Sequence, residues 1–330
     1  MTSIDFAPIA RDLRSLKLGA VLDEEPLSRH TSYRIGGPAR VYLEPTTEDG
    51  VVTSLEWLKN RDIPYFILGQ GTNVLVSDRG VQAVVISTSR GLKDCSISGT
   101  TVEAGSGVLL TKLSHLAERS GLAGLEFAIS IPGTLGGALV MNAGAHGSAM
   151  VKVVKSVRVW DPVAGVHQIT ADEAEFEYRQ SRFQRYPWIA LSAEMVLALG
   201  DHDHIRQTMR HFMAQRKSTQ PVGEPNAGSV FKNPTPLYAG QLIERVGAKG
   251  WRIGDAEVSS LHANFITNVG QAKASEVLHL MRRIRCVVYQ RYHVILRPEV
   301  RWIGPGEGGA RATWENLWFE EGVGLQEPCE

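Results

Sequence analysis

Apolar residues recur along this chain at helical and at alternating intervals, so both helices and strands are expected. Phe6, Ile9, Leu13 and Leu16 lie at helical spacing and predict a short amphipathic helix at the start. The same pattern predicts helices over residues 46–60, 109–120, 204–217, 239–246 and 272–289. Alternating or short continuous apolar runs predict strands over residues 39–43, 64–68, 83–87, 101–104, 153–160, 189–199, 264–268, 293–296 and 300–303. Helices and strands are therefore interleaved, and we find no internal repeat.

One long segment interrupts this pattern. From Phe127 to Val151 the chain contains no Asp, Glu, Lys or Arg, which is a length that a membrane span would need. Pro132 and closely spaced glycines make a membrane helix a poor interpretation, because both residue types disfavour helices. We expect instead a buried segment in which small side chains leave the backbone accessible. Its amides would suit the phosphates of a nucleotide cofactor, and its small apolar side chains would suit the flat ring.

A second glycine-rich segment follows the strand predicted over residues 64–68. It reads Gly69-Gln70-Gly71-Thr72-Asn73, and such a loop can turn its amides toward a phosphate. It lacks the third glycine of the dinucleotide fingerprint and the Gly-Lys-Ser/Thr of a P-loop. Taken alone, the segment is interpreted equally well as a hairpin turn.

The composition narrows the function. The 330 residues hold 35 Lys and Arg against 35 Asp and Glu, which disfavours nucleic acid or a membrane surface as a partner. Cys95, Cys286 and Cys329 are far apart and predict neither a disulfide framework nor a CxxC metal site. The start of the chain lacks the basic and apolar regions of a signal peptide, so we expect a cytoplasmic protein.

Two polar clusters are interpreted as structural. Asp201-His202-Asp203-His204 is expected to be a polar turn before a helix, since no further Cys or His stands at ligand spacing, and no metal site is predicted. The acidic residues between Asp172 and Glu177 are expected to form a solvated helix. Arg282, Arg283 and Arg285 are expected to face solvent rather than to bind phosphate.

Three other residues could take part in catalysis or binding. Arg179 has a planar, permanently charged fork that suits a carboxylate, although a surface arginine is the plainer interpretation. Ser229 stands among small residues before Lys232 and Asn233, and a serine in a turn is the alternative. Glu299 begins an apolar strand, where burial would favour its protonated form. An ion pair with Arg297 or Arg301 is the alternative for Glu299.

Taken in order, these segments resemble the UDP-N-acetylenolpyruvoylglucosamine reductase family. The resemblance covers about residues 26–304. It is carried by Thr31-Ser32-Tyr33-Arg34-Ile35-Gly36-Gly37-Pro38-Ala39, Gly69-Gln70-Gly71-Thr72-Asn73, Ile131-Pro132-Gly133-Thr134-Leu135-Gly136-Gly137, Tyr178-Arg179 with Ser181 and Phe183, Gly228-Ser229-Val230-Phe231-Lys232-Asn233-Pro234, His262-Ala263-Asn264-Phe265 and Pro298-Glu299-Val300.

The resemblance implies an α+β fold. A two-part FAD-binding fold of the vanillyl-alcohol oxidase type would be followed by a smaller α/β substrate-binding domain. We expect an N-terminal helix in residues 1–25, FAD-binding subdomains in 26–90 and 91–220, the substrate-binding domain in 221–290, and a return strand carrying Glu299 in 291–304. Residues 305–330 lie outside the family pattern and form a tail of unknown role. No segment matches the inserted tyrosine loop of one branch, so we expect the shorter branch.

The resemblance also implies the chemistry. NADPH would reduce bound FAD, and the flavin would reduce the enolpyruvyl group of UDP-N-acetylglucosamine enolpyruvate to give UDP-N-acetylmuramate for peptidoglycan. Arg179 and Glu299 would act on the substrate carboxylate, and Ser229 would protonate the carbanion. FAD would be held by Gly69, Gln70, Gly71, Thr72, Asn73, Ile131, Pro132, Gly133, Thr134, Gly136, Gly137, Asn142 and Gly144. Substrate would be held by Lys217, Lys232, Asn233 and His262, where position 262 is Gln in some relatives.

Two other functions are weighed against this one. Another FAD oxidoreductase of the same fold, acting on an alcohol or sugar, often attaches its flavin to a loop histidine, and only His146 is available for that. A nucleotide-binding scaffold without turnover would not need Arg179, Ser229 and Glu299 together. We therefore expect a monomeric reductase whose partner is its small-molecule substrate.

Overall fold

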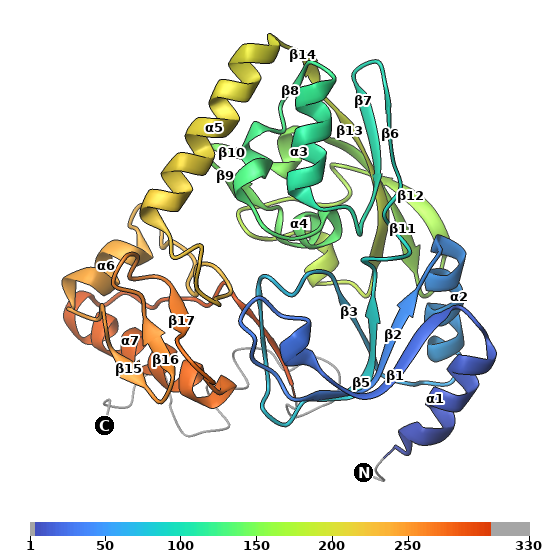
Figure 1. Cartoon of the computed structure of the whole chain (residues 1–330), viewed down its shortest axis with the longest axis horizontal. Coiled ribbons are helices and arrows are strands. Elements are labelled where there is room, and N and C mark those ends of the chain that lie inside the picture. The colour runs from blue at the N-terminus through green and yellow to red at the C-terminus, as the bar shows by residue number, and fades with distance from the viewer. Residues whose placement is uncertain (1–3, 305–330) are drawn as a thin grey trace. The chain divides into compact units, whose positions relative to one another are not determined.

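The computed structural model describes residues 4–304, and Figure 1 labels its elements. The chain divides into two compact units, and each is described by itself below. Unit 1 consists of the residues up to Leu22 together with Tyr42–Gln70 and Val85–Ser218. Unit 2 consists of Asp23–Val41, Gly71–Val84 and the residues from Thr219 onward. The tail of residues 305–330 lies outside the described residues.

The first half of the chain contains a four-stranded sheet. Its strand order is β1 (Gly19–Pro26), β2 (Pro38–Pro45), β5 (Val81–Ser87) and β3 (Tyr65–Leu68). Helices α1 (Phe6–Ser15) and α2 (Glu48–Lys59) come before β1 and after β2 along the chain. Both helices and the strands β2, β3 and β5 match predicted elements, whereas β1 was not predicted.

Unit 1 is built on an antiparallel sheet. Its strand order is β12 (Gly165–Thr170), β11 (Val154–Asp161), β13 (Ile189–Val196), β7 (Thr101–Gly105) and β6 (Cys95–Ser98). Helices α3 (Leu110–Arg119) and α4 (Leu135–Met141) share one apolar core with this sheet, in which Leu113, Leu135 and Val157 are fully buried. Two short antiparallel pairs complete the unit, β8 (Leu122–Ala123) with β14 (Ala198–Leu199) and β9 (Gly144–Ala145) with β10 (Ser148–Ala149). Helix α5 (His202–Thr219) ends it.

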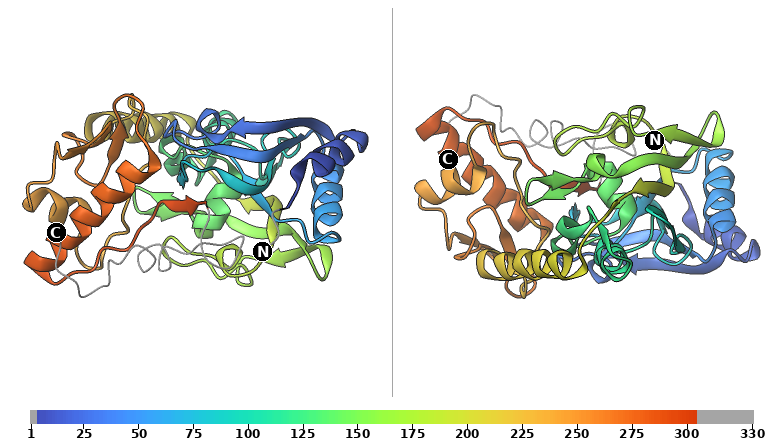
Figure 2. Two further views of the ribbon diagram at one scale, coloured as in Figure 1. Left: turned by 90° about the horizontal axis from the view of Figure 1, so that it is seen from below. Right: turned by 90° about the horizontal axis from the view of Figure 1, so that it is seen from above.

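Unit 2 has a core between two helices and a small sheet. The antiparallel sheet is β15 (Arg252–Ile253), β16 (Ala256–Val258) and β17 (Ile266–Asn268), and α7 (Ala274–Tyr292) lies along it in every view (Figures 1 and 2). Helix α6 (Ala239–Arg245) contributes Leu242 and Ile243 to the same core. Strand β18 (Arg301–Ile303) pairs in parallel with β4 (Val74–Val76), and so joins segments far apart in the sequence.

The pairing of β4 decides what the Gly69–Asn73 loop is. The hairpin interpretation required β4 to return alongside β3, but β4 pairs with β18 instead. The loop therefore connects strands of two different sheets, and the hairpin interpretation is wrong.

Several local predictions also need correction. Residues 172–177 form turns rather than a solvated helix, and residues 293–296 form no strand. His293 takes the left-handed conformation that ends α7, with φ of 55°. Leu296 then packs into the apolar core without a strand partner, which explains the strand-like apolar pattern. Strand β15 was not predicted.

The uncharged segment holds a helix that the glycine content had argued against. Helix α4 begins at Leu135, and the Thr134 hydroxyl accepts a hydrogen bond from the Gly137 N–H at 3.4 Å. A Cβ at Gly136 would lie 2.9 Å from the Ser106 Cβ, so glycine is needed for this close packing. Burial of Leu135 and Leu139 outweighs the low helix propensity of glycine, which is about 1 kcal/mol per residue. Among the described helices, none is both long and apolar enough to cross a membrane.

The cap of α2 allows a direct test of the predicted helix start. Thr47 is the N-cap, and its hydroxyl accepts a hydrogen bond from the Gly50 N–H at 3.0 Å. We expect Thr47→Ala to lower the free energy of unfolding by about 1 kcal/mol, because an amide at the helix start loses its acceptor. Thermal unfolding measures the change. Thr53→Ala, on the exposed face of the same helix, is the matched control, and an equal loss in both variants would contradict the cap assignment.

Candidate active site

The glycine-rich loop before α4 presents bare backbone at the surface of unit 1. Gly133 has a φ of 120°, which favours glycine, and a Cβ at Gly137 would meet only the Thr134 hydroxyl, at 3.8 Å. The N–H groups of Gly133 and Thr134 donate to no acceptor within residues 4–304. A loop with open space before it and two adjacent amides available is suited to hold a phosphate.

The rest of the unit holds this loop firmly in place. The N–H of Leu135 donates to the Val108 carbonyl at 2.8 Å, and that of Gly136 to the Ser106 carbonyl at 2.7 Å. On the other side, a Cβ at Gly69 would lie 2.5 Å from the Thr134 hydroxyl. The Gly69 backbone thus lies directly against the 131–137 segment, so the two predicted flavin loops meet within unit 1.

The first flavin loop continues from unit 1 into unit 2, where Gly71, Thr72 and Asn73 lie. A Cβ at Gly71 would lie 2.2 Å from the His30 carbonyl oxygen, and its φ is 60°, so only glycine fits. The Gly71 carbonyl accepts a hydrogen bond from the Ser32 N–H at 3.1 Å. Ser32 also donates its hydroxyl to the Asn226 carbonyl, at 2.6 Å, and thereby connects this loop to the segment before Ser229.

Arg179 lies in a turn of unit 1 rather than on a free surface. Its φ is 55°, its side chain is half-buried, and its Nη2 donates to the Gly144 carbonyl at 2.8 Å. Its own carbonyl accepts from the Gln184 side chain at 3.2 Å. Asn142 fixes the same turn from the end of α4, since its Nδ2 donates to the Glu177 carbonyl at 2.9 Å and its Oδ1 accepts from the Val151 N–H at 3.0 Å.

In unit 2, the chain segments that contain Ser229 and Glu299 are hydrogen-bonded to each other. Phe231 and Pro298 form an antiparallel bridge, and the Glu299 N–H donates to the Val230 carbonyl at 2.9 Å. Asn73 then bonds Glu299 from the flavin loop, because its Nδ2 donates to the Glu299 carbonyl at 3.2 Å. Residues separated by 226 positions are thus joined within one hydrogen-bonded group.

Asn264 also belongs to this hydrogen-bonded group. Its Oδ1 accepts from the Phe231 N–H at 3.1 Å, its Nδ2 donates to the Phe231 carbonyl at 2.8 Å, and its own carbonyl accepts from the Val230 N–H at 2.9 Å. These bonds fix the backbone on the carboxyl side of Ser229. The Ser229 hydroxyl itself is half-buried and makes no hydrogen bond within the described chain, so it is available to a ligand.

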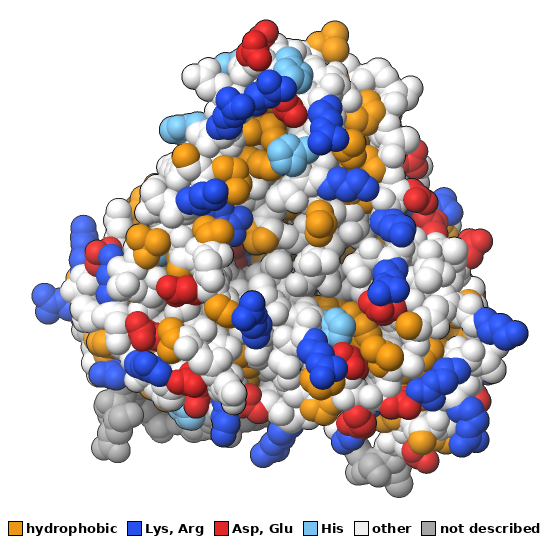
Figure 3. All heavy atoms as spheres, viewed as in Figure 1, with side chains coloured by type: hydrophobic (Ala, Val, Ile, Leu, Met, Phe, Trp, Pro, Cys, Tyr) orange, Lys and Arg blue, Asp and Glu red, His pale blue; other side chains and the backbone are white. Residues whose placement is uncertain are grey.

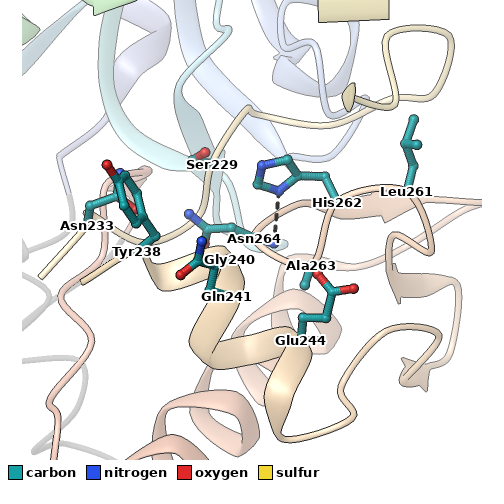
Figure 4. Close-up of a pocket in the computed structure, with 10 residues that line it drawn as sticks. All are labelled: Ser229, Asn233, Tyr238, Gly240, Gln241, Glu244, Leu261, His262, Ala263 and Asn264. Carbon is teal, nitrogen blue, oxygen red and sulfur yellow. Dashed lines mark hydrogen bonds between the residues drawn. The ribbon is translucent and has the colours of Figure 1, made fainter. Parts of the chain in front are cut away.

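A pocket of about 310 Å³ opens beside Ser229 within unit 2, a size that suits part of a nucleotide sugar (Figure 4). Its lining includes Ser229, which was predicted as a catalytic residue, and Asn233 and His262, which were predicted as substrate contacts. The remaining lining residues are Tyr238, Gly240, Gln241, Glu244, Leu261, Ala263 and Asn264. Tyr238, Gln241 and Glu244 were not predicted. Gln241 and Glu244 are three residues apart on one face of the helix predicted over residues 239–246, and Tyr238 directly precedes that helix.

The imidazole of His262 has a defined orientation in this pocket. Its Nδ1 accepts a hydrogen bond from the Asn264 N–H at 3.2 Å, drawn in Figure 4. The neutral ring therefore carries its proton on Nε2, which remains as a donor. A Cβ at Gly240 would lie 3.1 Å from the ring, and Phe265 packs edge-on at 4.8 Å between ring centroids. Burial lowers the pKa of His262, and nearby Lys249 lowers it further.

This lowered pKa predicts a pH dependence of stability. Because the folded pKa lies below the unfolded value of about 6.5, the unfolded chain binds more protons as the pH falls through this range. At higher pH His262 is neutral in both the folded and the unfolded chain, so we expect its titration not to affect the free energy of unfolding. We expect the free energy of unfolding to decrease as the pH falls below about 6.5. Denaturant midpoints of the wild type and His262→Gln from pH 7.5 to 5.5 measure the difference. His279→Gln, exposed on α7, is the control; an identical slope in wild type and His262→Gln would refute the assignment.

The remaining predicted residues fall in different surroundings. Lys217 is exposed on α5 of unit 1. Lys232 is half-buried and pairs its N–H with the Arg297 carbonyl at 2.8 Å, and the Asn233 side chain accepts from the Ala239 N–H at the start of α6 at 3.0 Å. Residues 202–204 form the start of α5 rather than a turn before it, so that part of the prediction is wrong. His202 and Arg206 both contact the Glu118 carboxylate. Within residues 4–304, no group of His, Cys, Asp and Glu could hold a metal.

Comparison with known proteins identifies the family. The model of the UDP-N-acetylenolpyruvoylglucosamine reductase C-terminal domain matches residues 220–303, and an FAD binding domain model matches residues 39–170. A UDP-N-acetylenolpyruvoylglucosamine reductase from Halalkalibacterium halodurans is 39% identical over 296 residues, which is 90% of this chain and 98% of that protein. This chain belongs to the UDP-N-acetylenolpyruvoylglucosamine reductase family.

Other members agree with this assignment. A reductase of the same name from Alkaliphilus oremlandii is 44% identical over 284 residues, 86% of this chain and 93% of that protein. The crystal structure of the reductase from Thermus caldophilus is 33% identical and superposes with a TM-score of 0.74, covering 86% of this chain and 98% of that one. The predicted α+β fold with an FAD-binding part is confirmed.

The residues present fit FAD. All of the predicted cofactor residues lie within the matched FAD binding domain, residues 39–170. The Gly133 and Thr134 N–H groups, which donate to no acceptor within residues 4–304, are of the kind that suits phosphate oxygens. Ser229, Lys232, Asn233, His262 and Glu299 lie within the matched reductase C-terminal domain, residues 220–303, while Arg179 and Lys217 lie outside both matched ranges.

Proposed function

We propose that this chain catalyses the NADPH-dependent, FAD-mediated reduction of UDP-N-acetylglucosamine enolpyruvate to UDP-N-acetylmuramate for peptidoglycan synthesis. The observation that carries the proposal is the hydrogen-bonded group in unit 2. Through Asn73 and Val230, it joins the flavin loop, Glu299 and the Ser229 segment. Family membership and the matched FAD binding domain support the same reaction.

The mechanism is proposed from the residue chemistry. FAD, when bound, supplies the hydride that adds to the enolpyruvyl double bond. Negative charge then develops on the carbon beside the substrate carboxylate and spreads into that carboxylate. We propose that Arg179 and a neutral Glu299 stabilise this charge, since donors aimed at developing charge contribute the largest single part of many rate enhancements.

Ser229 is proposed as the acid that protonates the carbanion. Its hydroxyl is half-buried, and no partner within the described chain competes for it. The backbone that carries it is held by Asn264 and by Glu299. A positioned proton donor contributes roughly 10²–10⁴-fold in rate.

Substrate is proposed to be held by Lys217, Lys232, Asn233 and His262. The lysines would offset the charge of the diphosphate or carboxylate, and Nε2 of His262 would donate to an oxygen of the nucleotide sugar. FAD is proposed to be held by the residues of the two flavin loops, with Asn142 positioning the Arg179 turn. The division into subdomains 26–90 and 91–220 also stays a prediction. We further propose a cytoplasmic monomer without nucleic-acid partners.

One experiment tests both half-reactions. The visible spectrum of the purified protein is recorded without oxygen, then after NADPH, then after UDP-N-acetylglucosamine enolpyruvate. A yellow flavin band that bleaches with NADPH and returns with substrate is the expected result. A colourless protein that takes up no added FAD would overturn the proposal. Recovery of the band only on admission of air would favour an oxidase acting on an alcohol or sugar.

A further inference from the structure

Ser130 is the residue through which the flavin loop of unit 1 joins the rest of that unit. It is the last residue of the 3-10 helix Glu126–Ser130 and directly precedes Ile131-Pro132-Gly133. Its side chain is buried, and its hydroxyl donates to the Phe127 carbonyl at 3.0 Å. Any shift of Ser130 must therefore move the start of the loop that presents the Gly133 and Thr134 amides.

Two side chains from distant parts of the sequence converge on Ser130. The His146 Nε2 lies 2.9 Å from the Ser130 hydroxyl, and the Arg216 guanidinium donates to the Ser130 carbonyl. His146 belongs to the tight turn between β9 and β10, and Arg216 belongs to the last turn of α5. Ser130 is thus held on its side chain by one residue and on its backbone by the other.

The Ser130 hydroxyl lies within hydrogen-bonding distance of two groups, the Phe127 carbonyl at 3.0 Å and the His146 Nε2 at 2.9 Å. The tautomer of His146 determines which of the two side chains donates in the second bond. In either direction, this bond connects the Ser130 side chain to the His146 ring. Burial lowers the pKa of His146, while a hydrogen bond with the Gln215 side chain partly opposes this.

His146 has a left-handed backbone conformation. Its φ is 53°, a region that is uncommon for residues other than glycine, although His, Asn and Asp adopt it more often than most. The ring stacks on Phe212 of α5, with ring centroids 3.8 Å apart and planes inclined by 3°. One turn later in α5, Arg216 reaches Ser130, so α5 supports both contacts at once.

We propose that His146 and Arg216 are positioning residues for FAD: they hold Ser130 so that the following Ile131–Thr134 loop keeps the geometry that binds the cofactor phosphates. The inference rests on the proposed function, because it assumes that this loop binds FAD. Neither residue needs to touch the cofactor. They act through Ser130 and the backbone of the loop that follows it.

The test compares FAD affinity with the stability of the FAD-free protein. Arg216→Gln and His146→Phe each remove one hydrogen-bond partner of Ser130, and phenylalanine keeps a ring to stack on Phe212. Arg210→Gln, exposed on the same helix, is the matched control for Arg216. FAD binding is titrated to the FAD-free wild type and variants, the visible spectrum of each complex is recorded, and thermal unfolding is measured without FAD.

We expect both variants to bind FAD about ten- to a hundredfold more weakly, the range for losing one strong hydrogen bond, and to show a shifted flavin spectrum. Their unfolding temperatures without FAD should match that of Arg210→Gln. Arg216→Lys should recover part of the affinity, because it restores a donor to the Ser130 carbonyl. An equal FAD affinity in wild type and both variants would overturn the proposal.

Two further outcomes are decisive. If a variant fails to fold, Arg216→Lys and His146→Asn replace it, since asparagine tolerates a positive φ, and unchanged FAD affinity in these milder variants would likewise overturn the proposal. If the wild type itself binds no FAD, the proposed function fails. If the wild type binds FAD and the variants bind it equally well, only the positioning role fails.

Discussion

Ser229→Ala is expected to slow reoxidation of the reduced flavin by substrate by roughly 10²–10⁴-fold, the usual contribution of a positioned proton donor. The carbanion would then have to take its proton from water. Reduction of the flavin by NADPH should be unchanged, since that half-reaction involves no carbanion. Anaerobic stopped-flow absorbance measures the two half-reactions separately, and this separation makes the expected effect specific to Ser229.

The structure offers a matched control for this variant. Ser260 lies in the same unit, is exposed, and is absent from the pocket lining, so Ser260→Ala should leave both rates unchanged. The Ser229 backbone is held by bonds that the substitution does not remove, so folding should be unaffected. Reoxidation at the wild-type rate in Ser229→Ala would eliminate Ser229 as the proton donor.

Glu299 should show a large difference between two substitutions. We expect Glu299→Ala to lower the rate of flavin reoxidation by substrate by roughly 10²–10³-fold, the loss measured for one donor to a developing anion. Glu299→Gln should lose no more than about tenfold, because its amide also donates a hydrogen bond and so substitutes for a neutral carboxyl group. The same stopped-flow experiment measures both variants.

The comparison tests the protonation state of Glu299 as well as its role. The hydrogen bonds of Glu299 to Asn73 and Val230 use its backbone, so both variants keep them. If the residue acts as an anion, the glutamine variant should be as slow as the alanine variant. Equal rates in the two variants would therefore contradict the neutral donor.

Much of the local structure could be predicted because it depends on neighbours in the sequence. The helix of α2 follows from its apolar spacing and from Thr47, whose hydroxyl caps it. Helix α4 could not be predicted in this way. Its glycines lower its intrinsic helix propensity. Gly136 is required by a close contact with Ser106, which lies 30 positions earlier in the chain.

The strand predicted over residues 293–296 failed for a related reason. Leu296 is buried in the apolar core and Val294 packs against it, while Ile295 is exposed. A strand also needs a neighbouring backbone, which apolar periodicity does not report. For the Gly69–Asn73 loop, local turn chemistry left a hairpin and a ligand loop equally good. The pairing of β4 with β18, which are far apart in sequence, excluded the hairpin.

The candidate site also has a part that depends on local sequence and a part that depends on tertiary contacts. Residue types and motif order were enough to name Arg179, Ser229 and Glu299 and the two flavin loops, because motifs are local. The pocket, which combines Ser229, Gln241 of α6 and His262, and the convergence of His146 and Arg216 on Ser130 depend on contacts between residues well separated in the sequence. The bond between Asn73 and Glu299, 226 positions apart, is of this second kind. Local sequence specifies which groups are present, whereas packing of distant segments determines which of them meet and with what geometry.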